Sequence, residues 1–178
     1  SLTSIVLPNN VTNIGSYAFS GCTSLTSVEI PNSVTSIGSY AFSGCSSLTS
    51  IEIPDGVTSI GSDAFSWCTS LTSVEIADSV TSIGYYAFKN CSNLASVVIP
   101  ESVKTIKSEA FYTCHKLVEV INKSSYITPQ KGSKEYGYLG YYALSVSNCD
   151  NAYVSKISYD NGYIIYTAGL ENILLGYE

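Results

Sequence analysis

The chain has 178 residues, of which 45% are hydrophobic and only 12% are charged, and its formal net charge is −6. This hydrophobicity excludes a disordered chain, and no apolar run reaches the ~18 residues of a membrane-spanning helix. All eight basic residues other than His are Lys. Without Arg the chain lacks the fork-shaped donor that reads phosphates and guanines, which argues against nucleic acid as a partner. The length corresponds to about one domain.

A step of 23 residues organises the first two-thirds of the chain. Cysteines stand at 22, 45, 68, 91 and 114. The same step joins Leu2 to Leu117, Val11 to Val103, Ile14 to Ile106 and Phe19 to Phe111. The apolar positions of one unit cannot close a core by themselves, but stacked units form continuous ladders of apolar side chains. The repeat therefore predicts a solenoid.

Each unit divides into short segments, as residues 25–47 illustrate. Residues 25–30 carry the alternation of a strand, which Pro31 ends. Residues 34–37 form a second extended piece, Gly38 permits a corner, and residues 39–43 are long enough for one helical turn. Equivalent strands of successive units must be parallel and about 4.8 Å apart. This predicts an α/β solenoid with its parallel sheet on the concave face, since unequal path lengths on the two faces would curve the stack.

Over residues 1–122 the unit L-x-x-V-x-I-P-x-x-V-x-x-I-G-x-x-A-F-x-x-C-x-x resembles the BspA-like, treponemal-type leucine-rich repeat. The resemblance implies a right-handed leucine-rich-repeat superhelix. It also implies a secreted or surface-attached bacterial protein, since family members are associated with adhesion to host proteins or to other cells. The family supplies no catalytic residues.

Residues 123–178 depart from the repeat and hold ten of the fifteen Tyr residues. Residues 139–144 resemble the I-G-x-x-A-F segment but arrive ten residues late, which predicts an irregular sixth coil with an insertion over 123–152. In residues 153–178, Asp160-Asn161-Gly162 between two alternating segments predicts a hairpin, and a third strand at 173–177 makes an antiparallel β-meander. The tyrosines are either strand core, which we favour, or a binding patch.

The cysteine row invites a disulfide or metal interpretation. Identical side chains in a parallel ladder point alongside one another, so buried, unpaired thiols are favoured over disulfides and over a metal site. A reduced row is unusual in a secreted protein, and burial explains it. Cys149 lies outside the ladder and is the one candidate reactive thiol. His115, the only His, follows Cys114 but falls at a solvent position, so a Cys–His nucleophile pair is disfavoured.

Outward-facing strand positions carry the candidate binding residues. They form an acidic row with a serine row beside it: Ser27, Glu29, Ser50, Glu52, Ser73 and Glu75. Like charges on adjacent strands cost up to about 1 kcal/mol, so the row indicates a basic partner or a cation, or else a tolerated residue copied by duplication. The second interpretation is the simpler one. Trp67 replaces Gly21 and Gly44 and is expected to be exposed.

The leading functional hypothesis is a protein-interaction or adhesion module of a secreted or cell-surface protein. Its partner would be a protein or glycan of the host matrix or of another cell, bound by the sheet face. The alternative is a structural spacer that presents another domain. An enzyme is the least favoured class, and we expect no cofactor. The chain starts with Ser and contains no Met, so we expect a processed product or a piece of a longer protein whose targeting signal lies outside it.

Overall fold

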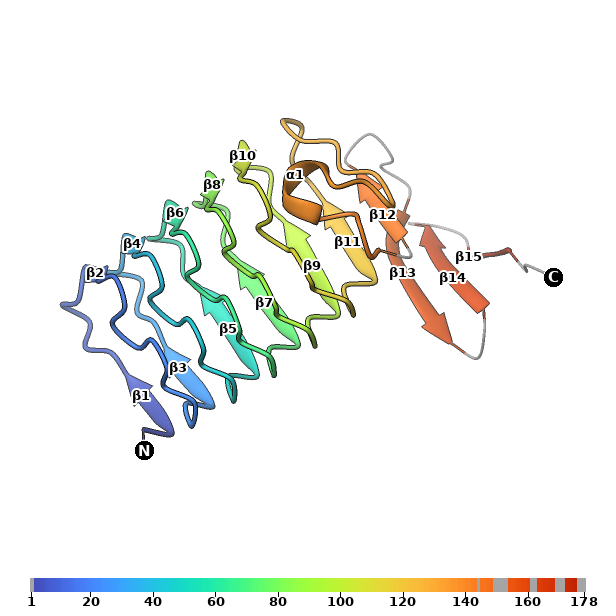
Figure 1. Cartoon of the computed structure of the whole chain (residues 1–178). Coiled ribbons are helices and arrows are strands. Elements are labelled where there is room, and N and C mark those ends of the chain that lie inside the picture. Colours follow the sequence, from blue (N-terminus) through green and yellow to red (C-terminus); the bar gives the residue numbers. More distant parts are fainter. Residues whose placement is uncertain (1, 144, 149–153, 161–162, 169–171, 176–178) are drawn as a thin grey trace.

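The computed structural model describes residues 2–143, 145–148, 154–160, 163–168 and 172–175. Its main part is a solenoid in which short parallel strands stack from coil to coil, with β1 at one end and β12 near the other (Figure 1). The predicted 23-residue repeat and the predicted parallel pairing are confirmed by the register of these strands, in which Ser4 pairs with Ser27 and Ser50 with Ser73.

One side of the solenoid, here called the strand face, is built by the strands that follow the Leu of each unit. They are β1 (Ser4–Val6), β3 (Ser27–Glu29), β5 (Ser50–Ile53), β7 (Ser73–Ile76), β9 (Ser96–Ile99), β11 (Glu119–Asn122) and β12 (Ser145–Asn148). Backbone hydrogen bonds just ahead of the strands run through the whole row. In each coil the N–H of the residue after the conserved Leu donates to the carbonyl of the equivalent residue in the preceding coil, at 2.8–3.4 Å. These donors are Thr26, Thr49, Thr72, Ala95 and Val118.

A second side carries one five-stranded parallel sheet of two-residue strands. In chain order these are β2 (Asn13–Ile14), β4 (Ser36–Ile37), β6 (Ser59–Ile60), β8 (Ser82–Ile83) and β10 (Thr105–Ile106). The isoleucine of each strand is buried and pairs with the isoleucine of the next strand. The predicted second extended segment is therefore confirmed.

The third side, here called the turn face, contains no helix within the five regular coils, so the predicted helical turn is wrong. In residues 40–45 alternate N–H groups donate to a carbonyl three residues back, and the N–H groups between them donate to carbonyls of the next coil. Tyr40 has φ 59°, which breaks a right-handed helix. Hydrogen bonds to the next coil therefore satisfy N–H groups that in a helix would donate to carbonyls of the same segment. The fold is thus a parallel β-solenoid rather than α/β.

Stacked phenylalanines form the centre of the core. Phe42, Phe65, Phe88 and Phe111 are completely buried, and their successive ring centroids lie 5.2–5.4 Å apart. Their predicted burial is confirmed. The same prediction is wrong for Phe19, which is only partly buried. Its ring stacks on Phe42 alone, and no ring of the described residues lies on its other side.

The sixth coil is present but has a different insertion from the predicted one. β12 pairs with β11 so that Val120 lies opposite Val146, a step of 26 residues rather than 23. In a regular unit the next strand begins 13 residues after the conserved Ile, as from Ile83 to Ser96, whereas Ser145 follows Leu139 by six. The net insertion is therefore three residues, not ten, and Leu139 belongs to the turn segment.

The extra residues of the sixth coil include α1 (Glu135–Tyr138), the one helix among the described residues. Its backbone is irregular, since Tyr136 and Gly137 have φ of 48° and 67°. The carbonyl of Gly137 accepts the Phe111 N–H at 2.7 Å, as the carbonyl of Ala110 accepts the N–H of Phe88. The insertion thus continues the hydrogen-bonding pattern of the turn face.

Beyond the solenoid, β13 (Val154–Asp160), β14 (Tyr163–Ala168) and β15 (Asn172–Leu175) pair antiparallel in that order. The residues predicted to turn between them, 161–162 and 169–171, lie outside the described residues, as does Cys149.

Candidate functional site

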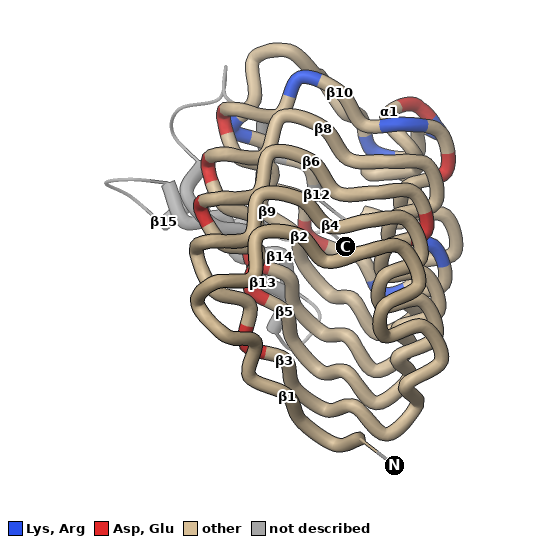
Figure 2. The backbone as a smooth tube through the Cα atoms, turned by 90° about the vertical axis from the view of Figure 1, so that its left-hand side faces the viewer, with Lys and Arg blue, Asp and Glu red and all other residues tan. Residues whose placement is uncertain are grey.

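An open groove crosses the strand face where the strands end. Two adjoining hollows of about 520 and 250 Å³ share Asn32, Glu52 and Pro54. The first also includes Ser27 and Glu29, and the second Asp55 and Glu75. We call six of the polar residues that line these hollows the acidic groove: Ser27, Glu29, Asn32, Glu52, Asp55 and Glu75. Acidic residues recur from coil to coil along this side of the stack, while Lys gathers near β10 and α1 (Figure 2).

Strand alternation directs the predicted site residues outward. In β5 the side chains of Ser50 and Glu52 are exposed while those of Ile51 and Ile53 are buried. The register places Glu52 opposite Glu75, so two carboxylates lie side by side on neighbouring strands. All six predicted residues of the acidic and serine rows are exposed on the strand face. Four of the six, Ser27 and the three glutamates, line the groove, whereas Ser50 and Ser73 do not.

The acidic row is confined to three central coils. At the same row position the flanking strands carry Val6, which is 69% exposed, and Val98, which is 38% exposed. Exposed valines at the ends show that the position tolerates uncharged side chains. The like-charge cost of about 1 kcal/mol or less per adjacent pair is therefore not imposed by the fold.

Two groove residues were not predicted from the sequence. Asn32 and Asp55 follow the Pro that ends each strand, and they extend the groove beyond the strands themselves. The signal was available in the repeat, because the residue after this corner is polar in every regular unit. These residues are Asn9, Asn32, Asp55, Asp78 and Glu101.

Trp67 is exposed, as predicted, with 57% of its surface accessible. It lies on the turn face and does not line the acidic groove, so the structure does not bring it together with the glutamates. Its φ of 63° is in the left-handed region, where Gly21 and Gly44 of earlier coils stand at 72° and 74°. A side chain there costs about 1–2 kcal/mol that Gly avoids.

The thiol ladder is a packing feature. Cys45, Cys68, Cys91 and Cys114 are buried and unpaired, which confirms the prediction for these four. Each Sγ–H donates to the carbonyl of a Phe in the preceding coil at 3.1–3.2 Å. Burial raises the pKa of Cys45 to about 11 and that of Cys114 to about 12, and it raises the pKa of Cys68 and Cys91 as well. These thiols are therefore poor nucleophiles at neutral pH.

Cys22 differs from the rest of the ladder, because it is only partly buried. The expectation that all five thiols are inaccessible is wrong for this one. We predict that iodoacetamide labels Cys22 in the folded protein at neutral pH, whereas Cys45 to Cys114 react only after unfolding. Peptide-resolved mass spectrometry with and without urea measures this, with Cys22→Ser as the control. Labelling of Cys68 in the folded state at the rate of Cys22 would contradict it.

His115 does not form a nucleophile pair. Its side chain is exposed and meets the ring of Tyr142 edge-on at 4.9 Å, while Cys114 is buried. Within the described residues, no group of three or more His, Cys, Asp or Glu side chains is placed to hold a metal ion. No helix of those residues has the length and apolar character needed to cross a membrane.

Several solved structures resemble the chain. A leucine-rich repeat protein of T. pallidum is 35% identical over 82% of this chain and 72% of its own, with a TM-score of 0.67. One from Bacteroides ovatus is 31% identical over 68% of this chain, with a TM-score of 0.52. A leucine-rich cell surface protein of Faecalibacterium prausnitzii is 27% identical over 99% of this chain, with a TM-score of 0.56. The chain spans 39% and 46% of the latter two proteins.

No curated protein matches the chain. The family model described as a BspA type leucine rich repeat region matches it in six copies, over residues 1–118 and 63–175. These matches cover the solenoid and extend past it, and they agree with the resemblance read from the 23-residue unit. The chain therefore belongs to the BspA-type leucine-rich repeat family.

Proposed function

We propose that the chain is a binding module of a secreted or cell-surface bacterial protein and holds a macromolecular partner in the acidic groove. Its relative in F. prausnitzii is a cell surface protein, which supports this location. The observation that carries the proposal is the set of exposed carboxylates, Glu29, Glu52 and Glu75, on successive strands along one open groove.

Charge and shape together indicate the partner's chemistry. Residues 1–83 contain six acidic residues and no Lys or Arg, so this part of the chain carries a charge of −6. A potential of this sign attracts basic groups and raises their local concentration. The groove is open and runs across coils, which suits an extended segment better than a small molecule. The partner is a protein or glycan of the host matrix or of another cell that presents several basic groups in a row.

The proposal includes a finer arrangement of the fold. The repeats of residues 1–122 form the binding unit, as a right-handed superhelix whose strand face is the concave side. Residues 123–152 add an irregular coil with an insertion, whose β12 pairs with β11 of the repeats, and residues 153–178 add the C-terminal hairpin and meander. A concave strand face brings the row of carboxylates closer to one curved partner than a flat face would.

A capture experiment tests the groove. The wild-type chain and Glu29→Gln/Glu52→Gln/Glu75→Gln are immobilised and exposed to extracts of extracellular matrix and of bacterial surfaces. Each exposed ion pair contributes about 0.2–1 kcal/mol, so removing three carboxylates is expected to weaken retention about tenfold. Retention by the wild type is expected to fall as salt rises.

The matched control is Glu101→Gln/Glu109→Gln/Glu135→Gln, which removes the same charge outside the groove. We expect this variant to retain the partner nearly as well as the wild type. If both variants lost retention of the partner equally, net charge alone would explain the binding, and the proposal of a site in the acidic groove would be overturned. Failure of the wild type to capture anything from several extracts would favour the structural spacer.

A further inference from the structure

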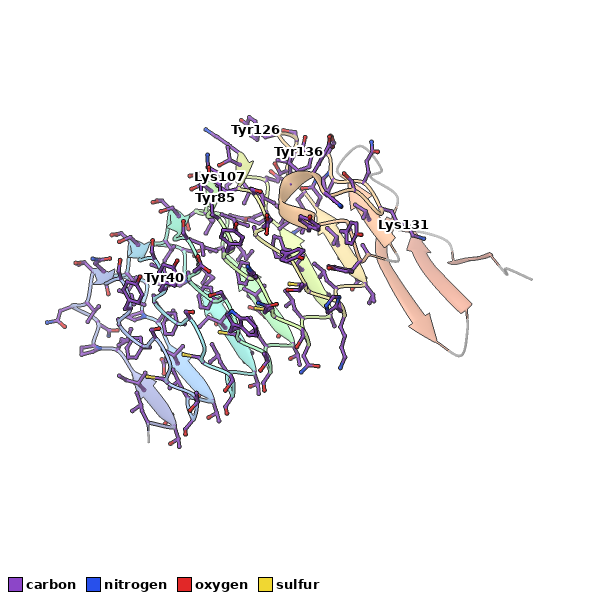
Figure 3. All side chains as sticks on the ribbon, viewed as in Figure 1. Tyr40, Tyr85, Lys107, Tyr126, Lys131 and Tyr136 are labelled. Carbon is purple, nitrogen blue, oxygen red and sulfur yellow. The ribbon has the colours of Figure 1, made fainter. Side chains whose placement is uncertain are left out.

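A second surface lies on the turn face of the C-terminal coils, where lysines lie over tyrosine rings. The Lys89 Nζ lies between two rings, 4.6 Å from the centroid of Tyr86 and 5.6 Å from that of Tyr112. The Lys107 Nζ lies 6.0 Å from the ring of Tyr85 (Figure 3). These five side chains come from two successive coils, so the pattern crosses the stack.

The sixth coil continues this pattern. The Tyr138 ring meets the Tyr112 ring edge-on at 5.0 Å and the Tyr141 ring at 5.2 Å. The Lys134 Nζ lies 6.0 and 5.9 Å from the centroids of Tyr138 and Tyr141. We call the three lysines and the rings they lie over the Tyr–Lys surface; ring contacts connect its members except the Lys107–Tyr85 pair, which borders them through Tyr86, the neighbour of Tyr85 in the chain.

Charge along the solenoid changes sign before this surface. Residues 84–148 contain seven Lys and four acidic residues, a balance of +3, against −6 for residues 1–83. Tyr85 and Tyr141 are 49% and 38% exposed, so a ligand on this surface can contact tyrosine rings and lysine ammonium groups at the same time. In the N-terminal coils the group beside a tyrosine is a carboxylate instead of an ammonium group. The charge of Asp63, together with a hydrogen bond from the phenol to its carboxylate, raises the pKa of Tyr40.

We propose that the Tyr–Lys surface binds an acidic polysaccharide, with sugar rings stacked on the tyrosines and carboxylate or sulfate groups paired with the lysines. Tyr offers a flat, rigid apolar face with a polar tip, which suits the apolar face of a sugar. An ammonium group already held over a ring keeps its N–H donors for an anion. A single-stranded nucleic acid would also stack on rings, but the chain has no Arg, whose planar fork is the usual bidentate donor to phosphate groups.

This inference is independent of the acidic groove, since it uses another face and the opposite charge. The probes are oligogalacturonate, a neutral maltooligosaccharide of equal length, and oligo-dT. Binding of each to the full chain is measured by isothermal titration calorimetry at low and high salt. We expect oligogalacturonate to bind, the neutral sugar to bind at least about tenfold more weakly, and added salt to weaken the acidic sugar.

Two sets of variants separate a specific surface from general charge. Lys89→Ala/Lys107→Ala/Lys134→Ala is expected to weaken oligogalacturonate about tenfold. Lys116→Ala/Lys123→Ala/Lys131→Ala removes the same charge at exposed lysines that do not lie over a ring in the described residues, and it is expected to change the affinity less than about threefold. Tyr85→Ser/Tyr141→Ser is expected to weaken binding, whereas Tyr17→Ser, at an exposed ring that stacks on Tyr40, is not.

Equal loss in both lysine variants would overturn the surface and leave only net charge. Equal binding of the acidic and neutral sugars would remove the lysines from recognition. Tighter binding of oligo-dT than of oligogalacturonate would replace the polysaccharide with a nucleic acid. Absence of binding to all three probes would overturn the proposal without touching the acidic groove.

Discussion

Phe65→Ala is expected to lower the free energy of unfolding by about 3–5 kcal/mol, the usual cost of truncating a buried aromatic side chain. Phe65 is completely buried, and its ring stacks on Phe42 at 5.3 Å and on Phe88 at 5.4 Å. Removing the ring leaves a cavity between two coils. The neighbours cannot collapse into it, because backbone hydrogen bonds fix the distance between coils on every side.

Phe19→Ala supplies the matched control for this measurement. The same substitution there removes a ring that is partly exposed and stacks on one neighbour at 5.1 Å. Its cost is expected to be about half that of Phe65→Ala, because less apolar area leaves water on folding. Urea unfolding followed by circular dichroism gives both midpoints and slopes. A Phe65→Ala cost no greater than that of Phe19→Ala would contradict a continuous aromatic core.

The repeat unit predicted the stack correctly because its information is local and repeated. Apolar residues that recur every 23 positions are buried when successive coils stack and place them in ladders. The register of Val28 and Ile51 with their neighbours follows from that step. Alternation within each strand likewise determined which side chains face outward, so the exposure of Glu29, Glu52 and Glu75 was predictable.

The turn face was mispredicted because its hydrogen bonds are made between coils. The sequence of a five-residue segment is compatible with a helical turn, but it does not determine which carbonyls accept hydrogen bonds from the N–H groups of the segment. In the structure, the N–H groups of Tyr40 and Phe42 donate to the next coil at 2.9 and 2.8 Å, an option that exists only once the coils are stacked. The left-handed Tyr40 follows from this tertiary choice.

The sixth coil shows a different limit. Residues 139–144 look like the corner segment of a regular unit, but that motif is short enough to match the wrong position. The pairing of β12 with β11 sets the length of the coil, and this depends on where Val146 packs rather than on a local pattern. The Tyr–Lys surface was missed for the same reason, since Lys107 and Tyr85 come from different coils.

Alkaline pH is expected to unfold the chain, because the buried thiols resist ionisation in the folded state. A thiol ionises at about pH 8.5 in an unfolded chain. Burial raises the pKa of Cys68, Cys91 and Cys114, the last to about 12. Below about pH 8.5 the thiols are protonated in both states, so their full contribution to stability is present. Above it, the unfolded chain loses protons that the folded chain keeps, and the free energy of unfolding falls.

The expected slope is large enough to measure against the whole stability of a domain. Each thiol lowers the free energy of unfolding by about 1.4 kcal/mol per pH unit between its two pKa values, so three lower it by about 4 kcal/mol per unit. Domains of ordinary stability, about 5–15 kcal/mol, would unfold within a few units. Urea midpoints from pH 7 to pH 11 measure this in the wild type and in Cys68→Ala/Cys91→Ala/Cys114→Ala. The variant should be less stable at pH 7 but should lose less stability as pH rises, because it lacks the three thiols while the titration of Tyr and Lys is common to both proteins. Parallel curves of stability against pH would show that the thiol ladder does not control alkaline unfolding.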